Sequence, residues 1–257
     1  MTKTPDNETQ GFTYGYYRRM IAAALEKGYK FVSFTEFDPE RHKRAVLLRH
    51  DIDLSLKSAL EMAKIEYEMG IRSTFFIRLN STFYNPFSQH GHKLVMQIKD
   101  CGHDFGLHFD PGFYESNKIP LLDGLQREKS ILKSGIDTPV IVFSQHRPVA
   151  LNLRNIDALT SEFKFSVYAE RFTKDCKYIS DSGQNWREGD LIDMLSHHER
   201  IQVLIHPVWW RDAYTPWQQC LTELAEQEAN LITDKADILL QRYAGYLEKV
   251  SKKKENS

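Results

Sequence analysis

Four apolar segments of this chain each end in aspartate or histidine side chains, and this pattern limits the folds open to it. The endings are Asp51-Ile52-Asp53, His108-Phe109-Asp110, His146-Arg147-Pro148 and His206-Pro207. An apolar strand interior is ordinary core, but ionisable side chains where several strands end need a common reason. In a parallel α/β barrel the carboxyl ends of the strands meet at one rim, where ligands and metals are held. The pattern therefore predicts a metal site of the hydrolase type at such a rim.

Strand and helix patterns alternate along the chain at the spacing of a parallel sheet with helices outside it. We expect strands at residues 45–50, 73–79, 104–109, 139–145, 165–169, 178–181 and 201–206. We expect helices at residues 12–27, 54–69, 93–101, 121–133, 152–163, 190–197 and 217–247. Seven strands are near the eight of a closed α/β barrel, so the predicted fold is α/β with an irregular barrel.

Length and composition set the class of protein. A chain of 257 residues with a net charge of -1 can bury a large core, and it has no overall field that favours nucleic acid. No run approaches the roughly 18–20 apolar residues of a membrane span, and no apolar signal segment stands at the N-terminus. The three separated cysteines fit reduced thiols. We expect a single cytoplasmic domain over residues 1–257, with flexible ends at about 1–10 and 251–257 and no nucleic-acid partner. The oligomeric state is not indicated.

Asp51 and Asp53 lie two residues apart, so on a strand their side chains point to the same side. Two close carboxylates resist joint ionisation unless a cation shares them. The pair therefore predicts one metal ligand and one base, without deciding which is which. The alternative is that Asp53 only caps the helix that follows it.

The next two strand ends offer further candidates. By the same period of two, His108 and Asp110 share a side. Asp110 could be a ligand, could orient the ring of His108, or could form the turn that follows. Arg147 could pair with Asp51 and fix its charge, or it could belong to a surface turn.

His206 is followed closely by Trp209 and Trp210. An imidazole near pH 7 is a natural general acid, and Asp181, at the end of another strand, could hold it in the right tautomer. The two indoles could stack on a sugar, or they could simply cover the end of the barrel.

Together these motifs, over residues 45–210, resemble the polysaccharide deacetylase superfamily, which has the NodB-homology fold. The segments that carry the resemblance to its five motifs are Asp51-Ile52-Asp53, the GHDFGLH run of residues 102–108, His146-Arg147-Pro148, Asp181 with Trp186, and Ile205-His206. The first motif has one residue inserted between its two aspartates. The whole pattern is most similar to the divergent branch encoded in bacterial surface-polysaccharide (lipopolysaccharide O-antigen) clusters.

The resemblance implies an irregular (β/α)7 barrel of the NodB type and a divalent metal ion. Gly112 stands where the family places its second ligand histidine, and His146 reaches the same rim. The expected ligands are therefore Asp53, His108 and His146, which leave a position for water, as in catalytic zinc sites. Zinc is the first choice, and cobalt, nickel, manganese and iron also suit these ligand atoms.

The resemblance also implies roles for the remaining residues. Asp51 would be the base and His206 the acid, with Arg147 and Asp181 as their partners, and Trp209, Trp210 and Asp110 would contact substrate. The implied reaction is deacetylation of an N-acetylated sugar in surface-polysaccharide biosynthesis, on a carbohydrate, nucleotide-sugar or lipid-linked glycan. Two alternatives stay open: hydrolysis of another amide or C–N bond on the same fold, and carbohydrate binding without catalysis.

Overall fold

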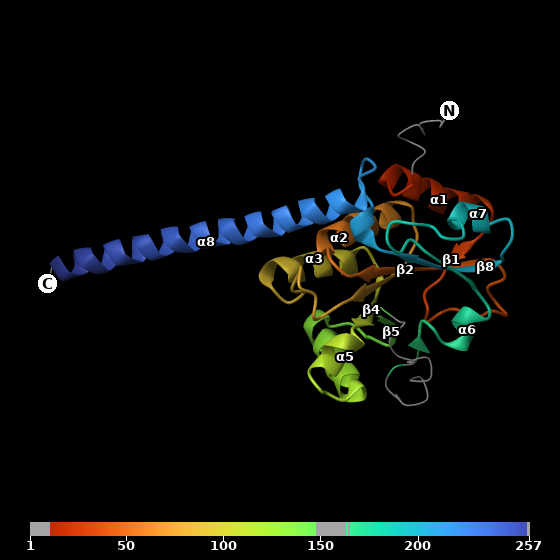
Figure 1. Cartoon of the computed structure of the whole chain (residues 1–257), viewed down its shortest axis with the longest axis horizontal. Coiled ribbons are helices and arrows are strands. Elements are labelled where there is room, and N and C mark those ends of the chain that lie inside the picture. Colours follow the sequence, from red (N-terminus) through yellow and green to blue (C-terminus); the bar gives the residue numbers. More distant parts are fainter. Residues whose placement is uncertain (1–10, 148–162, 164, 256–257) are drawn as a thin grey trace. The chain divides into compact units, whose positions relative to one another are not determined.

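The computed structural model describes residues 11–147, 163 and 165–255 (Figure 1). By its contacts the chain divides into two compact units, Met1–Thr215 and Pro216–Ser257. Each unit is considered by itself, and the interpretation as a single domain stays a prediction. Residues 1–10 and most of the helix expected at 152–163 lie outside the described residues.

The first unit is built on one parallel sheet. Its strands are β1 (Lys30–Phe31), β2 (Ala45–Ile52), β3 (Thr74–Ile77), β4 (Asp104–Phe109), β5 (Val142–Gln145), β6 (Phe165–Ser166), β7 (Lys177–Ser180) and β8 (Arg200–Ile205). Seven of them lie in the order β6-β5-β4-β3-β2-β8-β7, and β1 pairs with β2. Within the described residues β6 and β7 do not pair, so the sheet is open between them. The predicted α/β fold with an irregular barrel is confirmed as a parallel sheet that closes only in part, and β1 is an additional short strand that the sequence analysis did not predict.

Helices connect these strands. They are α1 (Tyr14–Glu26), α2 (Leu56–Glu68), α3 (Gln89–Asp100), α4 (Pro111–Ser116), α5 (Leu121–Ile136), α6 (Glu170–Thr173), α7 (Leu191–Met194) and the 3-10 turn η2 (Pro207–Trp209). The Ser55 hydroxyl caps α2 by accepting from the Ser58 backbone N–H, so Asp53 is not the cap of this helix. The short helices α4 and α6 were not expected, because one turn or two carries no periodic signal in the sequence.

Strand β2 is buried along its whole length and has two different faces. Ala45 and Leu47 pack with Phe76 and Val142 in one apolar cluster. The alternate residues Val46 and Leu48 pack in another cluster, with residues of α1 and α2. Because side chains alternate along a strand, Asp51 shares the first face, at the carboxyl end of β2. This alternation brings the carboxylates to the rim.

The second unit is the helix α8 (Trp217–Glu255). It continues eight residues beyond the end predicted at residue 247. Among the described residues, no helix has the length and apolar character needed to cross a bilayer.

Candidate functional site

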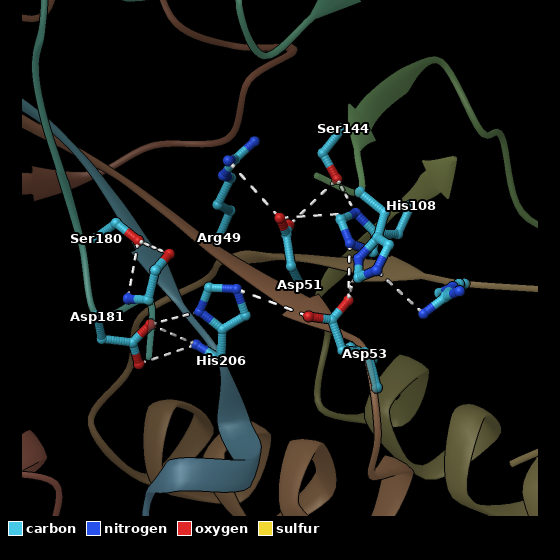
Figure 2. A network of polar contacts seen from close by, with 12 residues as sticks. Arg49, Asp51, Asp53, His108, Ser144, Ser180, Asp181 and His206 are labelled. Carbon is cyan, nitrogen blue, oxygen red and sulfur yellow. Dashed lines mark hydrogen bonds and ion pairs between the residues drawn. The ribbon is translucent and has the colours of Figure 1, made fainter. Parts of the chain in front are cut away.

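The carboxylate of Asp51 lies buried at the centre of the rim (Figure 2). Its Oδ1 accepts from the Ser144 hydroxyl at 3.2 Å, and its Oδ2 lies 3.7 Å from Nη2 of Arg49. Arg49 is fully buried, and its guanidinium lies within 6 Å of three aromatic ring centres, including that of Tyr168 at 5.4 Å. Arg147, the partner expected for Asp51, is exposed. The cation that the structure places beside Asp51 is therefore Arg49.

Three side chains from different strand ends converge next to Asp51. Asp53 Oδ1 lies 2.9 Å from His108 Nε2 and 3.1 Å from His146 Nδ1. One ligand-type atom from each residue lies within 4.8 Å of the others, which is close enough to hold one metal ion. These are the three residues expected as ligands, and their two nitrogens and one oxygen suit zinc and its neighbours.

The orientation of the His108 ring favours a metal. Its Nδ1 lies 2.7 Å from the Ser144 hydroxyl, which in turn donates to Asp51. Since the Ser144 proton is used on Asp51, the His108 ring donates from Nδ1 to Ser144, and its Nε2 is the nitrogen that faces Asp53, where a metal would take the place of the shared proton. Such outer hydrogen bonds orient metal-binding histidines.

His146 has a different neighbour. Nη1 of Arg78 lies 3.3 Å from its Nε2, and the same guanidinium pairs with the Asp110 carboxylate. A guanidinium only donates. The Nε2 of His146 therefore accepts, and its Nδ1 carries the proton that Asp53 receives. A metal bound through Nδ1 would displace that proton, and Arg78 would then face an N–H group. Arg78, at the end of β3, is a site residue that the sequence analysis missed.

The carboxylate of Asp53 is strongly biased toward its charged form. Burial by itself would raise its pKa, but the positive charge of His108 and hydrogen bonds from His108 and His146 hold it well below its ordinary range. An anionic oxygen between two imidazoles is suitable for a cation.

His206 lies across the rim from these residues. Its Nδ1 lies 2.6 Å from Oδ1 of Asp181, and its Nε2 lies 3.8 Å from Oδ2 of Asp53. Burial by itself would lower the pKa of His206, but the Asp181 carboxylate and, less strongly, Asp53 and Asp51 raise it to about 9. The ring is therefore protonated at neutral pH, and it can give up a proton from Nε2 while Asp181 holds Nδ1.

The three residues expected to contact substrate lie in different surroundings. Trp210 is fully buried, and its indole N–H donates to Asp181 at 2.9 Å. It therefore helps to position the carboxylate that contacts His206, and it cannot stack on a ligand. Trp209 is only partly buried. Asp110 caps α4 through the Gly112 N–H and pairs with Arg78. Of its three open roles, the structure shows that of the turn. Asp110 is linked to Asp53 only through Arg78 and His146, and it is not among the grouped ligands.

A second polar group lies on the opposite face of β2. Glu66 of α2 is fully buried, with His50 Nε2 at 2.5 Å and the Tyr17 hydroxyl donating at 2.6 Å. His103 Nδ1 lies 3.6 Å from the other Glu66 oxygen. Burial by itself would raise the pKa of Glu66, but the charge of His50 and its hydrogen bond lower it. This group anchors β2 to the helices and contributes no atom to the rim.

Comparison with known proteins gives distant likenesses only. No protein-family model and no curated protein sequence matches the chain. Similar solved structures include a polysaccharide deacetylase from Bacillus cereus, with a TM-score of 0.45 and 12% identity over 64% of this chain and 79% of that one. A family 4 carbohydrate esterase from Bacillus anthracis has a TM-score of 0.43 and 16% identity over 91% of this chain and 92% of that one.

A CE4 family pseudoenzyme from Bacillus anthracis is also similar, with a TM-score of 0.40 and 15% identity over 75% of this chain and 66% of that one. These similar structures therefore include both enzymes and a pseudoenzyme. The chemistry of this chain has to follow from its own side chains.

Proposed function

We propose that this protein is a metal-dependent hydrolase that removes the acetyl group of an N-acetylated sugar. The observation that carries the proposal is the arrangement of the rim, where Asp53, His108 and His146 group together between a buried carboxylate, Asp51, and a protonated imidazole, His206. A base and an acid on two sides of a cation site are the parts that amide hydrolysis needs.

Asp53, His108 and His146 would hold the ion. When bound, a divalent metal supplies a Lewis acid that polarises the carbonyl and lowers the pKa of water. We propose zinc, because three nitrogen and oxygen ligands with one position left open are its usual catalytic set.

The other residues would move the protons. Asp51, with Arg49 as its counter-charge and Ser144 fixing one oxygen, would accept a proton from the attacking water. His206 would donate its Nε2 proton to the leaving nitrogen, which must be protonated because an amine anion leaves too slowly. Asp181 would hold the ring in place and balance its charge before the transfer.

The finer assignment follows from the resemblance of the motifs to the divergent surface-polysaccharide branch of the deacetylases. We propose an N-acetylated nucleotide-sugar or lipid-linked glycan of bacterial lipopolysaccharide O-antigen synthesis as substrate, and a cytoplasmic location. Trp209 follows His206 by three residues and is partly exposed. It is therefore the aromatic residue that would contact the sugar.

The test is acetate release from N-acetylated nucleotide-sugars and oligosaccharides by zinc-loaded protein. Asp51→Asn should lower turnover about 100-fold or more and retain the metal in elemental analysis. Asp104→Asn is the matched control, because this carboxylate pairs with Arg72 at the opposite end of β4 and should not affect turnover. Glycan binding without acetate release by the wild-type protein would contradict the proposal and favour a carbohydrate-binding protein.

A further inference from the structure

The helix α8 carries a long apolar stripe that no described residue of the second unit covers. Its large apolar side chains are about half to two-thirds exposed: Ile232 67%, Ile238 64%, Leu239 49%, Leu240 68%, Tyr243 65%, Tyr246 63% and Leu247 61%. A helix of 39 residues gains little from backbone propensity alone and normally depends on packing of an apolar face. The stripe therefore needs an explanation.

The spacing of the stripe is that of a coiled coil. Small and large apolar residues recur at alternating intervals of four and three along one line of the helix, which we call the seam: Ala225, Ala229, Ile232, Ala236, Leu239, Tyr243 and Tyr246. This is a 3.5-residue repeat over three heptads, the period that keeps a seam against a second helix. Leu240 and Leu247 lie beside the seam and widen it. Ile238 lies away from it.

We propose that the seam of α8 binds the seam of a second copy of this chain, and that the two helices run antiparallel. When Ala236 of one copy lies beside Leu239 of the other, Ile232 falls beside Tyr243 and Ala229 beside Tyr246. Each layer then pairs a smaller with a larger side chain, so the space between the helices stays nearly constant. In a parallel pair, alanine would face alanine and tyrosine would face tyrosine, which leaves voids in some layers and crowding in others.

Charge favours the same orientation. Residues 221–237 hold five acidic side chains and one basic one, whereas residues 238–257 hold five basic and two acidic. An antiparallel pair places each acidic half against a basic half, and it brings Glu228 of one copy near Lys249 of the other. A parallel pair would place like charges together, which is unfavourable.

The exposed apolar area of the helix approaches that of a standard dimer interface. Six of these exposed side chains lie in the seam or beside it, and at about 100 Å² each they offer about 600 Å² per copy. Standard interfaces bury about 800 Å² per partner. The seam and the two leucines beside it thus offer about three quarters of the usual area.

Sedimentation velocity of the full chain tests the association. We expect a dimer at micromolar concentration. Leu239→Asp places a charge in the seam and should weaken dimerisation at least about 100-fold. Ile238→Asp is the matched control, since it introduces the same charge at a similarly exposed site off the seam, and it should leave the dimer intact. Circular dichroism checks that both variants stay folded.

Spin labels test the orientation. Gln227 and Gln241 lie on the side of α8 away from the seam and can each be changed to a labelled Cys, with the partly exposed Cys101 replaced by Ser. In the antiparallel pair the Gln227 labels should be about 30 Å apart along the axis and the Gln241 labels about 10 Å. Equal separations at the two sites would overturn the proposed orientation. A monomeric wild type, a dimer that survives Leu239→Asp, or a monomer that floats with anionic lipid vesicles would overturn the proposal itself.

Discussion

Replacing Asp181 by Asn should lower the pKa of His206 and change both stability and activity with pH. In the wild-type protein the Asp181 carboxylate contacts the His206 ring at 2.6 Å and is the largest influence that raises the pKa of His206 to about 9. Burial acts in the opposite direction. With the carboxylate charge removed, burial is opposed only by the more distant Asp53 and Asp51, so we expect the pKa to fall near or below 6.5.

The magnitude follows from the shift. A pKa of about 9 against an ordinary 6.5 corresponds to roughly 3 kcal/mol of preference for the protonated ring in the folded state. Because the folded-state pKa is the higher one, this contribution is fully present below about pH 6.5 and disappears as the pH rises through 9. The wild-type free energy of unfolding should lose about 3 kcal/mol from this group between pH 6 and pH 10, and the Asp181→Asn protein should lose little of it.

The pKa can be measured by NMR titration of the imidazole nitrogens in metal-free protein, with urea unfolding at the two pH values. In the acetate-release assay, the basic limb of the profile of rate against pH should move from near pH 9 toward pH 6.5, since His206 is the proposed acid. Asp190→Asn is the control: it also removes a buried carboxylate, which accepts from Tyr16 and caps α7, and it should leave the His206 titration unchanged. A His206 pKa that stays near 9 in Asp181→Asn would refute the reasoning, and so would a wild-type value near 6.5.

Three further changes test neighbouring parts of the site and its support. Arg78→Met should raise the affinity for zinc about 10-fold in calorimetry, because it removes the donor that opposes His146, whereas Arg72→Met at an exposed ion pair should not. Trp209→Ala should raise the KM for a glycan about 2- to 10-fold with kcat unchanged, from the loss of about 0.5–1.5 kcal/mol of stacking. Glu66→Gln should cost about 3–5 kcal/mol of unfolding free energy in urea, whereas Glu68→Gln, in an exposed pair, should cost less than about 1 kcal/mol.

The sequence was sufficient to predict the fold and the grouping of the expected ligands. The fold follows from periodicity, and the choice of ligands followed from periodicity together with the resemblance of the motifs to the deacetylases. The strand β4 was placed at its observed bounds, and β2 was only two residues short. Parallel strands carry their carboxyl ends to one rim, so Asp53, His108 and His146 could be grouped without knowing any distance.

The supporting residues were harder to predict, because their partners come from other elements. Arg49 lies two residues before Asp51, so the period of two was a usable signal, whereas the position of Arg147 at another strand end indicated the wrong arginine. The burial of Trp210 depends on its packing against Phe12 and Tyr17, which are almost two hundred residues away in the sequence. No local pattern indicates such a contact.

The two faces of β2 explain why a buried ion pair lies on each side of the strand. Arg49 and Asp51 point to the rim side, whereas His50 points to α2 and meets Glu66. A slip of one residue would exchange the faces, which would take His50 away from Glu66 and turn both Arg49 and Asp51 away from the rim. The Glu66–His50 pair therefore helps to hold the register that places Asp51 and Asp53 at the rim. We therefore expect Glu66→Gln to weaken zinc binding as well as the fold, since a strand held less firmly positions Asp53 less well.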